Sequence, residues 1–126
     1  MPCVLYIEDN KDNRALVRRV LLAEDFDVLL ADSAEEGIRV ALERQPDLIL
    51  MDVNMPGMDG HTATERLRAL DAVRNIPIVA LTANVMRGDR EKALGAGMDG
   101  YIQKPIDVDR FPNEIRRYMN AERSAR

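Results

Sequence analysis

Five side chains that could act together on a phosphoryl group each come directly after a short strand-like run of residues. They are the carboxylates of Glu8, Asp9 and Asp52, the hydroxyl of Thr82 and the ammonium of Lys104. Three carboxylates held close together repel one another unless a cation lies among them, and hard oxygen ligands of this kind suit Mg²⁺. A metal ion on one side and the lysine on the other would neutralise the phosphoryl oxygens, and the hydroxyl would position them. Asp52 could then act as a covalent nucleophile that becomes an aspartyl phosphate.

The elements that must hold these side chains alternate along the chain. Strands are predicted at residues 3–7, 26–31, 48–51, 78–81 and 101–103. Apolar residues at helical spacing predict helices at residues 11–24, 34–42, 63–70, 87–96 and 111–119. Strands that are apolar throughout are buried on both faces, so the pattern predicts an α/β fold of five βα units, a doubly wound sandwich around a five-stranded parallel sheet. Ligands bind at the carboxyl ends of such strands, where the five side chains would meet.

Two helix ends are marked by local sequence. Ser33 followed by Glu36 has the capping-box pattern, which predicts the start of the second helix there. Gly97 is placed to end the fourth helix, because glycine readily takes the left-handed conformation of a C-terminal cap.

Length and composition limit the class of protein. The 126 residues predict one domain, residues 1–126, with a core over 3–120 and a polar tail at 121–126. Eighteen Lys and Arg against 22 Asp and Glu give a net charge of −4, which argues against direct nucleic-acid binding or an anionic membrane surface, although a local basic patch stays possible. One cysteine excludes an internal disulfide and a cysteine-based zinc site, and one histidine excludes multi-histidine metal sites. No apolar run approaches the ~18 residues of a membrane span and no signal peptide is visible, so we expect a cytoplasmic protein.

The motifs at the predicted strand ends resemble those of a known family. They are Glu8-Asp9, Asp52, Thr82-Ala83 and Lys104-Pro105. In this order and at these spacings they resemble the receiver domain of two-component response regulators, and the resemblance covers the chain from Val4 to about Met119. It implies the flavodoxin-like strand order 2-1-3-4-5.

The resemblance also implies how a phosphoryl group is taken up. Asp52 would accept it from a phosphohistidine of a sensor histidine kinase or a histidine phosphotransfer protein. Mg²⁺, or Mn²⁺ in its place, would be held by Asp9, Asp52 and the backbone carbonyl of Asn54, with Glu8 assisting through a water. The protein would then be a phosphoacceptor regulator that catalyses only its own phosphorylation and dephosphorylation.

The same resemblance implies a conformational switch. Thr82 would donate its hydroxyl to one phosphoryl oxygen, and Lys104, joined to Pro105 by a cis peptide bond, would pair with another. Tyr101 stands at the family's aromatic switch position and would follow Thr82 when phosphorylation draws it inward. The face of the fourth helix, fifth strand and fifth helix would thereby regulate a downstream protein target. No nucleic-acid or membrane partner is expected.

Other functions remain open on these residues. The switch could be a stand-alone regulator or the receiver domain of a hybrid histidine kinase in a phosphorelay. A phosphatase resembling the haloacid dehalogenase class would need a second aspartate two residues after its nucleophile, where this chain has Asn54. A flavodoxin-like electron carrier would need a phosphate-binding loop after the first strand, where Glu8 and Asp9 would repel a flavin phosphate.

Overall fold

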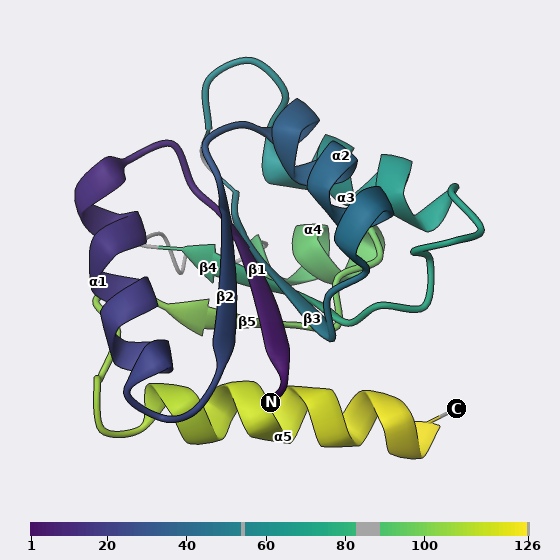
Figure 1. The fold of residues 1–126 in the computed structure, drawn as a ribbon. Coiled ribbons are helices and arrows are strands. Elements are labelled where there is room, and N and C mark those ends of the chain that lie inside the picture. The colour runs from purple at the N-terminus through teal and green to yellow at the C-terminus, as the bar shows by residue number, and fades with distance from the viewer. Residues whose placement is uncertain (54, 83–88, 126) are drawn as a thin grey trace.

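The structure, a computed structural model, describes residues 1–53, 55–82 and 89–125. Its elements follow in the order β1 (Cys3–Ile7), α1 (Lys11–Leu22), β2 (Asp27–Ala31), α2 (Ala34–Arg44), β3 (Leu48–Asp52), α3 (Gly60–Arg68), β4 (Ile78–Thr82), α4 (Asp89–Gly95), β5 (Gly100–Gln103) and α5 (Phe111–Ala125). Neighbouring strands are parallel and lie in the order β2-β1-β3-β4-β5 (Figure 1). The predicted α/β fold and strand order are therefore confirmed.

The sheet separates two apolar layers. Helices α1 and α5 pack on one face, and α2, α3 and α4 pack on the other (Figure 1). Every residue of β3 and β4 is buried, as their continuously apolar sequences predict. The site side chains thus stand at the ends of strands that both layers hold in place.

The two predicted helix ends are confirmed. The Ser33 hydroxyl oxygen accepts a hydrogen bond from the Glu36 backbone N–H at 3.2 Å, at the start of α2. Gly97, with φ of 103°, follows α4, and its N–H donates to the Leu94 carbonyl at 3.1 Å. The next N–H, that of Met98, donates to the Ala93 carbonyl at 3.0 Å, which completes a Schellman cap.

The connection from the first helix to the second strand differs from the prediction. Helix α1 ends at Leu22, and β2 begins at Asp27, so Phe26 lies before the strand and not in it. Asp25 takes a left-handed conformation with φ of 67°, and this turn redirects the chain before the strand can start. Phe26 is fully buried, with the Arg116 guanidinium 5.1 Å from its ring centre. An apolar periodicity marks Phe26 as a core residue but does not tell a strand from a buried turn.

The start of the predicted fourth helix is only partly covered. Residues 87 and 88 lie outside the described residues, and α4 runs over Asp89–Gly95 within them. None of the helices in the described ranges is both long and apolar enough to span a membrane.

One arginine joins several segments at the amino-terminal edge of the sheet, away from the site. Arg68, at the end of α3, donates to the backbone carbonyls of Gly97, Arg74 and Ile76 at 2.9, 2.7 and 2.7 Å. It also pairs with the Asp99 carboxylate at 2.8 Å, in a bridge that is largely buried. The same carboxylate accepts from the Ile78 N–H at 2.8 Å, so α3, the start of β4 and the chain entering β5 are held together.

Strand β5 is tied to β4 at both of its ends. The Asp99 N–H donates to the Ile78 carbonyl at 2.7 Å, and the Lys104 N–H donates to the Thr82 carbonyl at 2.7 Å. The second of these bonds delivers Lys104 to the carboxyl-terminal edge of the sheet, where the candidate site lies.

Candidate functional site

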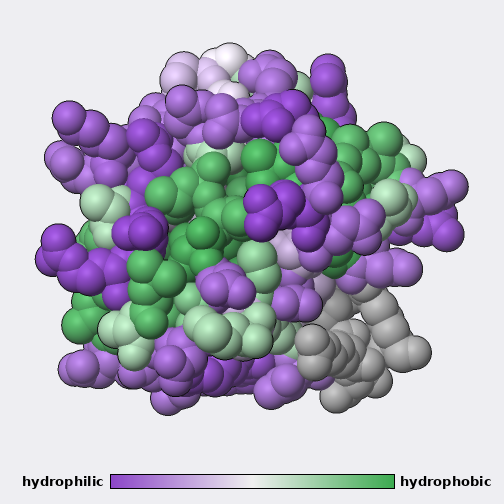
Figure 2. Space-filling view, in the orientation of Figure 1, coloured by the Kyte–Doolittle hydropathy of each residue, from purple (hydrophilic) through white to green (hydrophobic). Residues whose placement is uncertain are grey.

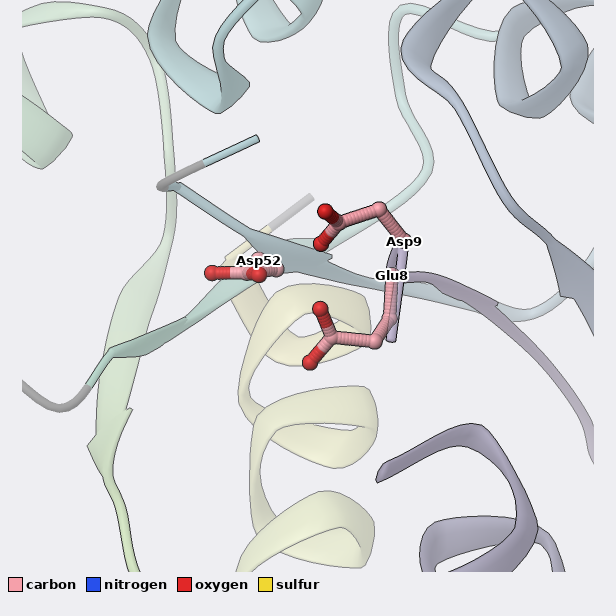
Figure 3. Close-up of side chains that lie close together, drawn as sticks. All are labelled: Glu8, Asp9 and Asp52. Carbon is pink, nitrogen blue, oxygen red and sulfur yellow. The ribbon is translucent and has the colours of Figure 1, made fainter. Parts of the chain in front are cut away.

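Three carboxylates meet at the carboxyl-terminal edge of the sheet (Figure 3). Glu8 and Asp9 follow β1, and Asp52 is the last residue of the neighbouring strand β3. One oxygen from each of the three lies within 4.8 Å of the other two. Glu8 and Asp52 are buried, with 1% and 5% of their surface exposed, while Asp9 is exposed. The cluster therefore has a buried floor and a side that water or a ligand can reach.

The ammonium of Lys104 lies against this cluster. Its Nζ is 3.0 Å from Oε1 of Glu8 and 3.9 Å from Oδ2 of Asp52. The Lys104–Pro105 peptide bond, which the resemblance implied to be cis, is cis in the structure. The predicted lysine and the predicted carboxylates are thus brought together, although Lys104 is 96 residues from Glu8 in the sequence.

The hydroxyl and the aromatic residue predicted for the site lie on the next two strands. Thr82 is the last residue of β4 and is buried, one position beyond Leu81, which pairs with Asp52 in the sheet. Tyr101, on β5, is half-buried and packs against the layer that includes α3 and α4. The remaining predicted residue, Asn54, lies outside the described residues, as does the neighbour of Thr82 at position 83.

Glu8 has hydrogen-bond partners that the sequence motifs did not indicate. The Tyr6 hydroxyl donates to Oε1 of Glu8 at 2.9 Å, and the Asn13 amide donates to the same oxygen at 3.1 Å. Burial alone would raise the pKa of Glu8. Hydrogen bonds with Asp52, Lys104 and Tyr6 outweigh burial and lower that pKa to about 2. Tyr6 was the available sequence signal for these partners, because it stands between aliphatic residues of a predicted strand and a buried phenol needs a polar partner.

The ionised Glu8 carboxylate is expected to stabilise the metal-free fold, and acid is expected to remove this stabilisation. The pKa of about 2 in the folded protein lies below the ordinary value of 4.5. The contribution is therefore fully present above the ordinary pKa of 4.5 and is lost as the pH falls toward 2. Urea unfolding of the wild type and of Glu8→Gln in EDTA, from about pH 6 to about pH 2.5, measures it. As the pH falls, the free energy of unfolding of the wild type should decrease more steeply than that of Glu8→Gln. Equal slopes of the free energy against pH in the two proteins would contradict the lowered pKa of Glu8.

The donor set fits a hard divalent cation. Mg²⁺ binds through one or two carboxylates and keeps several waters. Asp9 and Asp52 supply such carboxylates, and the exposure of Asp9 leaves room for waters. Glu8 is the less available ligand, because one of its oxygens already accepts hydrogen bonds from Tyr6, Asn13 and Lys104.

Comparisons with known proteins agree with this geometry. Residues 4–116 match the family model described as the response regulator receiver domain. The chain is 38% identical over 116 residues to the polar-differentiation response regulator DivK of Brucella anthropi. The aligned region covers 92% of this chain and 94% of that protein. A second relative is the receiver domain of a Pseudomonas aeruginosa sensor histidine kinase, which was solved with a magnesium ion coordinated in its active site cleft. It is 35% identical to this chain, with a TM-score of 0.87, and the match covers 94% of this chain and 98% of that one. Chemotaxis protein CheY4 of Vibrio cholerae has a TM-score of 0.89 at 25% identity, with the same coverage of 94% and 98%.

Proposed function

This chain belongs to the family of response regulator receiver domains, and on that premise we propose that it is a phosphorylation-dependent switch that takes a phosphoryl group onto Asp52. The observation that carries the proposal is one cluster: Asp52 stands beside Asp9 and Glu8, with Lys104 Nζ at 3.9 Å from its carboxylate. The family's general role is in two-component signalling. The family match favours this function over the phosphatase and flavodoxin alternatives. A cytoplasmic location is part of the proposal.

The reaction is a phosphoryl transfer between two protein side chains. A carboxylate oxygen of Asp52 forms a bond to phosphorus while the bond from phosphorus to an imidazole nitrogen of the donor's phosphohistidine breaks, and the imidazole leaves. Bound Mg²⁺ would reduce the repulsion between the carboxylate and the phosphoryl oxygens. Asp9 and Asp52 would hold that ion, with the Asn54 carbonyl as the third expected ligand, and Glu8 would assist through a water. The occupied Oε1 of Glu8 supports this indirect role.

The proposed switch runs from the phosphoryl group to the face of α4, β5 and α5. Lys104 exchanges part of its pairing with Glu8 for a phosphoryl oxygen, and the Thr82 hydroxyl donates to another. Tyr101 then moves into the space that Thr82 leaves. The half-buried position of Tyr101 next to α4 supports its choice as the moving residue, because a change there alters the surface that a target protein reads.

The phosphodonor is proposed to approach over an apolar hollow beside the site. Asn13, Leu16 and Val17 of α1 line one wall of it, and the other wall includes Lys104 and Ile106. The hollow has a volume of about 310 Å³, and Leu16 is 42% exposed at its rim. Because Lys104 belongs both to this hollow and to the carboxylate cluster, a donor protein seated here would deliver its phosphohistidine next to Asp52.

Incubation with acetyl phosphate and Mg²⁺ is expected to add a single phosphoryl group, and EDTA is expected to prevent it. Intact mass spectrometry measures the adduct, and peptide mapping locates it in the segment that contains Asp52. Phosphate esters should show no multiple turnover under the same conditions. An adduct that forms equally well in EDTA, or that maps elsewhere, would contradict the proposal.

In a second version of the function, Asp52 is phosphorylated in the same way, but the phosphoryl group is then passed on to another protein. The 35% identity to the receiver domain of a sensor histidine kinase supports a place inside a phosphorelay. In that version the phosphorylated chain should return its phosphoryl group quickly to a histidine phosphotransfer protein. In the first version it should instead bind a target protein through the face of α4, β5 and α5.

A further inference from the structure

The outer edge of the sheet is open at β2. The Asp27 N–H donates to the Pro2 carbonyl at 2.8 Å, and the Ala31 carbonyl accepts from the Glu8 N–H at 3.0 Å, so these residues turn their peptide groups toward β1. Peptide groups alternate in direction along a strand. Those of Val28 and Leu30 therefore point away from β1, to the side where the described chain places no further strand.

This edge carries an apolar surface with a cationic border. Figure 2 shows hydrophobic side chains gathered over β2, which lies at the front in this view, and hydrophilic side chains beside them over α1. Leu22 is 40% exposed, and Leu29 and Leu30 are half-buried. An exposed strand edge with apolar neighbours is a place where another chain can pair.

The cationic border consists of four side chains on one side of α1. Lys11, Arg14, Arg18 and Arg19 line a hollow of about 440 Å³, together with Leu22 and Leu30. Within the described ranges, none of these four side chains forms an ion pair of 4.0 Å or less. The cations that do are Arg39, Arg68, Arg74, Lys104 and Arg116. In a chain with a net charge of −4, this is a local concentration of unneutralised positive charge.

We propose that the β2 edge and this cationic side of α1 bind an extended acidic segment of a partner protein by strand addition. The backbone of the segment would pair with Val28 and Leu30, its carboxylates would face the cations of α1, and its apolar side chains would lie on the other face near Leu29. The surface touches the carboxylate cluster at one point, where the Arg14 guanidinium donates to the Glu8 backbone carbonyl at 2.7 Å, and its other cations lie further along α1.

Charge favours this occupant over two others. A long polyanion such as a nucleic acid would also meet the exposed carboxylates of Asp12, Asp27 and Asp32, which flank the edge, and the negative charge of the whole chain. A second copy of this chain, paired antiparallel at β2, would bring the cations of its own α1 against those of the first. A short segment with alternating side chains avoids the first conflict, because its carboxylates lie on the α1 face with Val28 and Leu30, whereas Asp27 lies on the face of Leu29. It avoids the second conflict because it carries no cations.

The test uses a short fluorescein-labelled peptide that alternates glutamate with leucine, added to the full chain at low ionic strength. Fluorescence anisotropy should show binding that weakens at least about tenfold in Arg18→Glu/Arg19→Glu. The matched control Arg66→Glu/Arg117→Glu changes the net charge equally on other helices and should bind within about twofold of the wild type. In amide hydrogen exchange, the peptide should slow exchange at Val28 and Leu30 and leave Leu29, already turned toward β1, unchanged.

Several results would overturn the proposal. They are equal peptide binding in both double variants, amide protection confined to other strands, and self-association of the chain through β2 in sedimentation experiments. Tighter binding of a DNA duplex or of anionic phospholipid vesicles than of the peptide, at the same arginines, would also overturn it and assign the surface to that other partner.

Discussion

An Asp52→Asn variant is expected to form no phosphoryl adduct and, in the absence of Mg²⁺, to be more stable than the wild type. The amide cannot act as a nucleophile toward phosphorus, so loss of the adduct should be complete. Stability should rise because the amide can donate a hydrogen bond to Glu8 without carrying a charge, whereas an ionised Asp52 is repelled by two other carboxylates whose nearest oxygens lie within 4.8 Å. Relieving this repulsion, or the cost of keeping Asp52 protonated, is expected to add about 1 kcal/mol to the free energy of unfolding.

Thermal unfolding with and without Mg²⁺ tests both halves of this prediction. In EDTA the melting temperature of Asp52→Asn should exceed that of the wild type by a few degrees, roughly 3–5 °C for a domain of this size. Added Mg²⁺ should raise the melting temperature of the wild type much more than that of the variant, because the variant lacks a ligand carboxylate. Asp109→Asn, on an exposed residue, is the control and should shift neither value. A less stable Asp52→Asn protein in EDTA would mean that the carboxylates are not mutually repulsive in the folded state.

An Arg68→Ala variant is expected to lose about 3 kcal/mol of stability, although Arg68 lies at the edge of the sheet opposite to the site. The substitution removes the donors for three backbone carbonyls and the cation that pairs with Asp99. The Arg68 and Asp99 side chains are only 20% and 24% exposed, so water replaces these bonds incompletely.

Urea unfolding of three variants separates the causes. Arg66→Ala removes an exposed arginine from the same helix and should change the free energy of unfolding by less than about 0.5 kcal/mol. Arg68→Lys keeps the charge but loses the planar fork that reaches several carbonyls at once, so it should recover only part of the loss. If Arg68→Ala and Arg66→Ala proved equally stable, the hydrogen bonds of Arg68 would contribute nothing net to the fold.

Local patterns in the sequence were enough to predict the order of the elements and most of the site. Continuous apolar runs identified the strands, and parallel pairing then requires their carboxyl ends to share one edge. For this reason the amino-acid pattern alone places Asp52 and Lys104 together. Ser33 and Gly97 were predictable for a simpler reason, since a helix cap depends on residues within one turn.

Interactions between distant segments could not be predicted in this way. Arg68 pairs with Asp99 across 31 residues, and no spacing rule distinguishes it from the exposed Arg66 two positions earlier. The start of β2 was misplaced because burial of Phe26 arises from its packing next to α5, and apolar character alone does not reveal a turn at Asp25. The cations of α1 could be seen in the sequence, but their grouping beside an open strand edge depends on the strand order.

The attachment of β5 at both ends constrains how this part of the chain can evolve. Asp99 is bonded to the start of β4 and Lys104 to its end, with only the strand between them. Side chains alternate between the two faces of a sheet, so deleting or inserting one residue would turn either Tyr101 or Ile102 toward the wrong layer, or would draw Lys104 away from Glu8. Substitutions can change the composition of this stretch, but its length is fixed by the two attachments. Length variation is therefore expected to be confined to the loops on either side.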